Sequence, residues 1–242
     1  MAQVKRGHEG ALDSILLVGA MPFEIKIVLE FPFQRVIVSN IEDFIDPTTF
    51  REIMVLVDGD ERLDYCESSL ESLSFPGRSF DLVVCKETLH HLSRPVLGLY
   101  EMLRVCRHGL FFIEGNLTLL TKLLRKTKIG SSYEENWSIS KGRVRDNFVF
   151  KWDPDFVVEI LRSYYLESGF SATFYDMWYS SRFHQTYFLR VVLLLLNRFS
   201  QLIPLFPRGN YLICLILPGH DIPHKIGWEL EKTVEPDTIC TG

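Results

Sequence analysis

The sequence predicts an α/β fold with a mostly parallel sheet, and three observations lead to this prediction. Mainly apolar runs of strand length recur at fairly even spacing along the 242 residues. These runs are continuous rather than alternating, which is typical of strands covered on both faces. Segments with helical periodicity lie between them, and such alternation favours parallel strands joined by right-handed crossovers. A hydrophobic share of 47% suits one globular domain, which we place at residues 1–220.

Seven short apolar runs account for the predicted strands. In chain order they are Ile15–Val18, Val36–Val38, Leu63–Cys66, Leu82–Cys85, Leu110–Ile113, Ala172–Tyr175 and Tyr211–Leu217. Parallel strands need helical crossovers between them, so runs that follow one another along the chain are expected to be joined through helices.

Two of the intervening segments have the clearest helical pattern. Pro95 suits the first turn of a helix, and the apolar side chains that follow share one face: Val96, Leu99, Tyr100 and Leu103. A second helix begins after Asp153 as its cap, has Pro154 in its first turn, and ends at Gly169. Its buried face is expected to consist of Phe156, Ile160, Leu161 and Tyr164.

Three segments do not follow this alternation of strands and helices. Residues 117–150 are polar, basic and long, so they form either a lid or substrate loop or a solvated surface excursion. Residues 186–206 predict an inserted helix that is apolar nearly all round. We expect that helix to pack on the sheet, the pocket mouth or a second subunit, with peripheral membrane contact as the alternative. Residues 221–242 read as a C-terminal tail.

Composition and charge exclude several classes of protein. The net charge of −5 argues against a nucleic-acid binder. The five cysteines are scattered without a C-x-x-C pair, which favours a reduced, cytoplasmic protein and gives a metal site no support. The longest apolar run, Val191–Leu196, is too short for a transmembrane segment, which needs roughly 20 residues. Lys5 and Arg6 imitate the start of a signal peptide, but charged residues interrupt the pattern and a buried strand explains the apolar run.

Ligands of open parallel sheets bind beyond the carboxyl ends of the strands, so chemistry is expected in the residues that follow each strand. After the first strand comes "GAMPF" from Gly19, and after the second "NIED" from Asn40. The third is followed by "ESSLESLSFP" and the fourth by "KETLHHL" from Lys86. Glu114 and Asn116 end the fifth strand.

The segment around the fourth strand carries a resemblance to a known family. It contains Leu73, Phe75 and Pro76, then "SFD" ending at Asp81, "LHH" ending at His91, and "EMLRV". In this order the motifs resemble the class I S-adenosylmethionine-dependent methyltransferases, in particular the group acting on small molecules, lipids and sugars. The resemblance is dense over residues 69–116. It implies a Rossmann-like methyltransferase fold: a mostly parallel seven-stranded sheet whose last strand is antiparallel. Together with the alternation of strands and helices, it also predicts that Ile15–Val18 and Leu82–Cys85 are neighbouring parallel strands.

The first loop departs from the pattern of that family. The family has an acidic residue before three alternating glycines, whereas this chain has Leu17, keeps Gly19, and places Met21 and Phe23 where glycines would lie. Glycine suits such a loop because it adopts left-handed angles and lets the backbone approach a ligand. The family's acidic residue after the second strand, which holds the ribose, falls on Asn40.

The resemblance and the strand ends together give the candidate site residues. The expected contacts of S-adenosylmethionine are Gly19, Ala20, Asn40, Ser69, Leu70, Lys86 and His91. Substrate contacts are expected from Glu114 and Asn116, with a plain turn role as the alternative. His90 and His91 face the ligand or cap and pack the helix. Cys85 is read as a buried structural thiol, and no residue is assigned as a catalytic base.

Two functions are consistent with these residues. One is a methyltransferase that acts on a small molecule, with a sugar or lipid precursor as the candidate class, and oligomer formation is left open. The other is a methyltransferase-like binding or scaffold protein that has lost its cofactor. The intact fourth-strand motif suits both, because a fold does not fix a function. The unusual first loop favours the second, whereas the ordinary role of such folds favours the first.

Overall fold

The computed structural model describes residues 12–41, 45–118, 133–140, 143–164, 170–177, 195, 198, 211–218 and 230–234. The chain divides into two compact units, which subdivide the predicted domain. The first unit comprises Met1–Phe112 and Tyr133–Phe150, and the second comprises Ile113–Ser132 and Lys151–Gly242.

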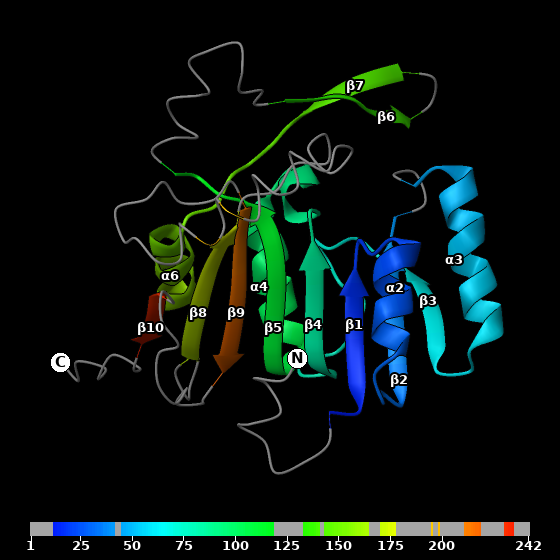
Figure 1. The fold of residues 1–242 in the computed structure, drawn as a ribbon, viewed down its shortest axis with the longest axis horizontal. Helices are drawn as coiled ribbons and strands as arrows, with labels where there is room; N and C mark the ends of the chain where they lie inside the picture. Colours follow the sequence, from blue (N-terminus) through cyan, green and yellow to red (C-terminus); the bar gives the residue numbers. More distant parts are fainter. Residues whose placement is uncertain are drawn as a thin grey trace. The chain divides into compact units, whose positions relative to one another are not determined.

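The main sheet in the first unit is built on five strands. They are β1 (Ser14–Val18), β2 (Arg35–Asn40), β3 (Leu63–Glu67), β4 (Phe80–Lys86) and β5 (Cys106–Gly115), whose last residues belong to the second unit. Their order is β5-β4-β1-β2-β3 (Figure 1). β1 pairs in parallel with both β2 and β4, so that Ile15 lies opposite Val36 on one side and Leu82 on the other. The predicted pairing of the first and fourth strands is therefore confirmed.

Helices cover both faces of these strands. In Figure 1, α2 (Pro22–Leu29) lies in front of the strands and α4 (Pro95–Val105) behind them. α3 (Pro47–Gly59) contacts α2 and β3, and a short 3-10 helix, η2 (Leu89–His91), precedes α4. Asp46 caps α3 by accepting the backbone N–H groups of Thr48 and Thr49.

The buried face of α4 lies slightly to one side of the predicted one. Leu99 and Leu103 are buried as expected, but Val96 and Tyr100 are only half-buried. The rest of the buried face is formed by Gly98, Met102 and Val105. Gly98 permits close packing, since a Cβ there would stand 2.4 Å from Cδ1 of Leu92.

Asp81 of the "SFD" motif ties the start of β1 to the start of β4. Its carboxylate accepts the backbone N–H groups of Asp13 and Ser14 at 3.0 and 2.9 Å and the Ser14 hydroxyl at 2.9 Å. It also pairs with Arg107. Burial raises the pKa of Asp81, but the hydrogen bonds from Ser14 and Asp13 and the charge of Arg107 outweigh it, so the pKa lies below its usual value.

The "EMLRV" motif braces the loop that carries "LSFP". Glu101 accepts the backbone N–H of Leu73 at 2.8 Å, and Arg104 donates to the carbonyls of Phe75 and Leu73 at 2.7 and 2.9 Å. Glu101 and Arg104 also form an ion pair at 2.7 Å. The "EMLRV" motif therefore holds this loop against α4, whereas Asp81 of the "SFD" motif joins β1 to β4.

The second unit contains α6 (Pro154–Ser163) and the strands β8 (Phe170–Met177), β9 (Tyr211–Pro218) and β10 (Leu230–Val234). The strand order is β10-β8-β9-β5, counting the end of β5. β9 runs antiparallel to β8, as predicted for the strand at 211–217. Asp153 caps α6 as predicted, by accepting the N–H of Phe156 at 3.0 Å.

Several described segments differ from their predicted form. Within residues 117–150, β6 (Tyr133–Ser140) and β7 (Arg143–Phe148) form a two-stranded antiparallel sheet. The expected tail contains β10, which pairs antiparallel with β8. The predicted helix at 186–206 lies outside the described residues apart from Leu195 and Arg198, which are helical and exposed. Of the helices described here, none has the length and apolar character that crossing a bilayer requires.

Candidate functional site

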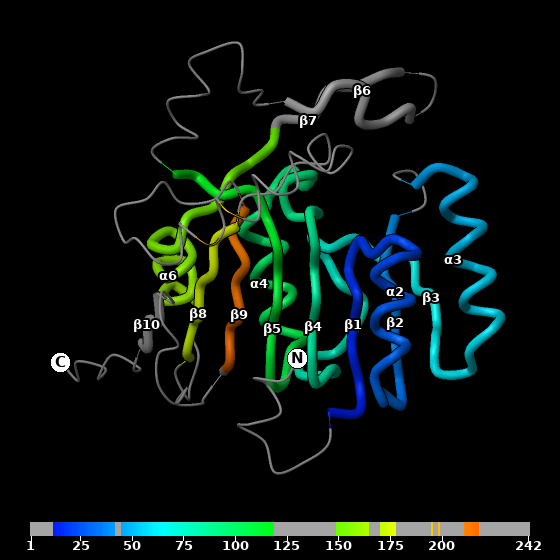
Figure 2. Tube along the Cα trace, viewed as in Figure 1, coloured from blue at the N-terminus to red at the C-terminus, as the bar shows by residue number. Residues whose placement is uncertain are grey.

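A cavity of about 400 Å³ opens at the carboxyl ends of β1, β2 and β4 in the first unit. The neighbouring traces of β2, β1 and β4 end together at this edge in Figure 2. This is where an open parallel sheet places its ligand, and the volume is that of a small-molecule site. The lining residues are Val18, Gly19, Met21, Glu24, Ser39, Asn40, Ile41, Ile45, Ser68, Leu70, Lys86, Glu87, Thr88, His90, His91 and Leu92.

Gly19 joins the loop after β1 to the loop after β4. Its φ of +68° lies in the left-handed region, and its N–H donates to the Ser39 carbonyl at 2.9 Å. A Cβ at this position would stand 2.0 Å from Oγ1 of Thr88. Thr88 is held in turn by donating to the Lys86 carbonyl at 2.8 Å. Glycine is therefore required at position 19 for both conformation and space.

Met21 and Phe23 occupy positions where glycine's conformational freedom is not needed. Met21 is the N-cap of α2 and has extended angles of φ −95° and ψ 164°. Its N–H donates to Oε2 of Glu24 at 3.1 Å, which forms one half of a capping box. Phe23 lies in the first turn of α2 with 70% of its surface exposed. The side chain of Met21 lines the cavity, whereas Phe23 points to solvent and leaves the cavity clear.

Asn40 anchors the first loop from the end of β2. It is buried and lines the cavity, and its Nδ2 donates to the Ala20 carbonyl at 3.1 Å. A carboxylate at this position could not make that bond, because it has no N–H to donate. The amide that stands where the resembling family has an acid thus has a structural task in this chain.

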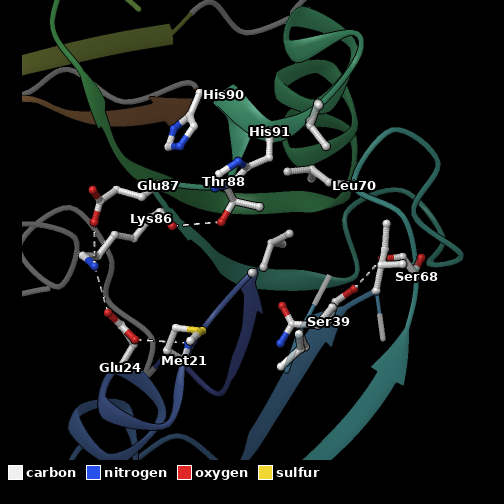
Figure 3. A pocket seen from close by; sticks show the side chains of 16 residues that line it. Met21, Glu24, Ser39, Ser68, Leu70, Lys86, Glu87, Thr88, His90 and His91 are labelled. Atoms are coloured by element: carbon white, nitrogen blue, oxygen red, sulfur yellow. Dashed lines mark hydrogen bonds and ion pairs between the residues drawn. The ribbon is translucent and has the colours of Figure 1, made fainter. Parts of the chain in front are cut away.

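A charged group lies on one side of the cavity (Figure 3). Nζ of Lys86 is 3.1 Å from Oε1 of Glu24 and 2.9 Å from Oε2 of Glu87. Burial lowers the pKa of Lys86, but its bonds to Glu87 and Glu24 outweigh burial and leave the pKa above its ordinary value. Lys86 therefore remains an ammonium, flanked by two carboxylates.

The other side of the cavity is uncharged. The Ser39 hydroxyl donates to the Ser68 carbonyl at 3.3 Å, and the Ser68 N–H donates to the Asn40 carbonyl at 3.1 Å. Leu70 supplies an apolar surface beside them and is itself buried. The predicted contact Ser69 does not line the cavity; its hydroxyl accepts the Glu71 N–H at 3.2 Å and shapes the turn.

The two histidines of η2 both line the cavity. Their ring centroids are 4.1 Å apart, with 52° between the ring planes. His90 is buried, with 4% of its surface exposed. The sequence predicted a ligand contact for His91 and left the role of His90 open.

Glu114 and Asn116 belong to the second unit, where both are buried at the end of β5. Asn116 forms a parallel bridge with Trp152, supported by a bond of 2.7 Å from the Leu117 N–H to the Trp152 carbonyl. Their predicted contact with a substrate stays a prediction.

Sequence reasoning missed several residues of the cavity. Glu24 and Glu87 were not predicted, although Glu87 immediately follows Lys86 and Glu24 lies four residues after Ala20 in "GAMPFE". The x-x-Glu spacing after Met21 is the signal of a capping box and could have drawn attention to Glu24. Ser68 and Thr88 were missed because each is one or two residues away from a predicted contact.

Comparisons with known proteins agree with this architecture. A family model described as a methyltransferase domain matches residues 49–113. No curated protein sequence matches the chain. A Haloferax volcanii methyltransferase structure, described as a complex with the Trm112 methyltransferase activator, is similar with 11% identity, a TM-score of 0.57 and coverage of 90% of this chain and 88% of that one.

Two further solved structures have a similar fold. An S-adenosylmethionine-dependent methyltransferase from Mesorhizobium loti has 11% identity and a TM-score of 0.55, covering 89% of this chain and 96% of that one. The [4+2]-cyclase SpnF has 14% identity and a TM-score of 0.51, covering 91% and 80%. At such identities the similarity shows the fold alone. The predicted fold is confirmed: a Rossmann-like methyltransferase fold with a mostly parallel sheet and an antiparallel last strand.

Proposed function

We propose that this chain is an S-adenosylmethionine-dependent methyltransferase that acts on a small molecule. One observation carries the proposal. The cavity lies at the carboxyl ends of the parallel strands and is lined by five of the seven expected cofactor contacts, namely Gly19, Asn40, Leu70, Lys86 and His91. The match of residues 49–113 to a methyltransferase domain model supports the same reading.

The residues of the cavity fit such a cofactor. Leu70, Ile41 and Ile45 offer apolar surface for a base, and Asn40 has its amide oxygen left to accept a hydroxyl group. Lys86, Glu24 and Glu87 offer charged partners for an amino-acid group. Phe23 is exposed to solvent and does not fill the cavity. The first loop therefore lacks two glycines without closing the place where a ligand would bind.

In such a reaction the main task of the protein is to position the methyl donor and the acceptor. S-adenosylmethionine supplies a methyl group bound to a sulfonium, and its transfer is an in-line displacement in which positioning donor and acceptor gives much of the rate. We propose a sugar or lipid precursor as the acceptor class. Glu114 and Asn116 are the proposed acceptor contacts, and residues 117–150, which include the β6–β7 sheet, are the proposed lid.

Calorimetry tests the proposal directly. We expect S-adenosylhomocysteine and S-adenosylmethionine to give saturable heats at ligand concentrations up to the millimolar range, while ATP at the same concentrations gives none. A panel of sugar and lipid precursors with radiolabelled methyl donor then searches for the acceptor. Absence of heat from both sulfur ligands at millimolar concentration would refute cofactor binding.

The alternative function is a methyltransferase-like protein that binds a partner without transferring a methyl group. It is favoured by Leu17, which is 1% exposed and stands where the resembling family has an acid. The shared fold of a [4+2]-cyclase illustrates that this architecture serves other chemistry. Lack of cofactor binding by a well-folded protein would support this alternative.

A further inference from the structure

The two sides of the cavity differ in chemistry. On one side Ser39, Asn40 and Leu70 offer uncharged hydrogen-bonding and apolar groups. On the other side Glu24, Lys86 and Glu87 form what we call the charged cluster (Figure 3). A ligand that fills the cavity would therefore have a largely neutral end and an end that carries charges of both signs.

The charged cluster is held firmly in place. Lys86 ends β4, and Glu87 follows it with a left-handed φ of 49°, which directs the backbone away from the strand. Glu24 is fixed by its bond to the Met21 N–H at 3.1 Å in the first turn of α2. The three groups thus come from the start of α2 and the end of β4, next to the loops that meet at Gly19 and Thr88.

The charged cluster retains capacity to bind a ligand. Lys86 has three N–H donors, and its ion pairs with Glu24 and Glu87 use two of them. The side chains of Lys86, Glu24 and Glu87 are 42%, 22% and 32% exposed. Two carboxylates around one ammonium leave one negative charge in excess. The charged cluster can therefore accept a cationic group and also donate to an anionic one.

We propose that the charged cluster binds the amino-acid end of the methyl donor, with Lys86 pairing to its carboxylate and Glu24 and Glu87 to its ammonium. This inference rests on the proposed function. The chain has Leu17 where the resembling family has an acidic residue, so the carboxylates on this side of the cavity are those of Glu24, in the first turn of α2, and Glu87, which follows β4.

The competing explanation is a structural ion pair between α2 and β4. Exposed ion pairs contribute little to stability, and a purely structural pair would not distinguish ligands by their amino-acid end. Selectivity between two ligands that differ only in that end therefore separates the two explanations.

The test compares S-adenosylhomocysteine with 5′-methylthioadenosine, which lacks the amino-acid end, by calorimetry on the full chain. We expect the wild type to bind S-adenosylhomocysteine at least about tenfold more tightly, a difference of about 1.4 kcal/mol. Glu24→Gln keeps an oxygen for the Met21 N–H but loses the charge. The variant should lower the affinity for S-adenosylhomocysteine about tenfold and that for 5′-methylthioadenosine less than twofold. Lys86→Met should change the two affinities in the same way.

A matched control removes the same charge elsewhere. Glu52→Gln changes an exposed glutamate of α3 outside the cavity lining and should leave both affinities unchanged. If Lys86→Met fails to fold, Glu87→Gln replaces it, with thermal melting as the folding check. Equal affinities for the two ligands, unaffected by the variants, would make the charged cluster a structural ion pair while the proposed function survives. If neither ligand binds, the proposed function fails and this inference falls with it.

Discussion

The region around β4 and α4 and the loop after β1 are held in place by different kinds of hydrogen bond. Around β4, charged side chains satisfy backbone groups: Asp81 binds the start of β1, and Glu101 with Arg104 braces the loop at Leu73. The loop after β1 is anchored mainly by neutral bonds, from the Gly19 N–H to the Ser39 carbonyl and from the Asn40 amide to the Ala20 carbonyl. Glu24 adds a single charged acceptor, for the Met21 N–H.

This difference shows why a dense motif and a sparse one lie in the same site. Of the residues that resemble a methyltransferase family around β4, Asp81, Glu101 and Arg104 serve the framework, whereas His90 and His91 line the cavity. The first loop needs glycine only at Gly19, because Met21 has an extended backbone and Phe23 lies in a helix. A shortage of glycines in the sequence is thus compatible with an open cavity.

The largest expected effect comes from Gly19→Ala. The new Cβ would overlap the Thr88 side chain and would force alanine into a left-handed conformation. Together these should reduce the free energy of unfolding by about 3 kcal/mol. The control is Gly59→Ala, since a Cβ at Gly59 meets nothing within 4 Å. Chemical denaturation measures the free energy of unfolding of both variants. Equal stability of Gly19→Ala and Gly59→Ala would contradict the close contact between the loop after β1 and the loop after β4.

The next effect tests the framework around β4. Asp81→Asn leaves Arg107 without its carboxylate and weakens bonds to two backbone N–H groups, so we expect a loss of about 2 kcal/mol in the free energy of unfolding. Ligand affinity of the folded fraction should stay within twofold of wild type. A large loss of affinity at unchanged stability would show that the framework and the cavity are not separate in function.

The same carboxylate predicts a pH dependence. The folded-state pKa of Asp81 lies below the ordinary value of 3.8. Its contribution to stability is therefore fully present above pH 3.8 and is lost as the pH falls through the lower folded-state pKa. The stability gap between wild type and Asp81→Asn should narrow on acidification from about pH 5 to pH 2. A gap that stays constant over this range would mean that Asp81 is not the titrating group.

A smaller effect is expected from Asn40→Ala. Loss of the neutral hydrogen bond to the Ala20 carbonyl should reduce the binding free energy of S-adenosylhomocysteine, measured by calorimetry, by about 1 kcal/mol. Asn40→Asp restores the acid of the resembling family but loses the N–H donor. It should bind no better than the alanine variant, and tighter binding would show that ribose recognition outweighs loop anchoring.

The smallest effect should come from Met21→Gly. Because Met21 already has extended angles, glycine relieves no strain and only removes a side chain from the cavity wall. Binding should be unchanged or slightly tighter, by less than about 1 kcal/mol, as calorimetry would show. Clearly weaker binding would assign the Met21 side chain a contact with the ligand.

The strands and the pairing of β1 with β4 could be predicted because continuous apolar runs report burial on both faces. The edges were harder: β6 is largely polar, and β10 has three polar residues between its apolar ends, Leu230 and Val234. The site was predicted where contacts follow strand ends, as at Asn40 and Lys86. It was missed at Glu24, whose role depends on a lysine far along the chain, and the conformation at Met21 was misjudged because residue counts do not fix backbone angles.

The bond from Asp81 to Ser14 also has a consequence for the order of events during synthesis. The two residues are 67 positions apart, so the first strand is synthesised well before its carboxylate partner. At typical elongation rates that interval is roughly 3 to 13 s. During it, the buried segment Ile15–Val18 can pair only with β2, which leaves its other edge open to chaperones or to misassociation. Translational pauses before β4 would therefore lower the yield of native protein more than pauses after it.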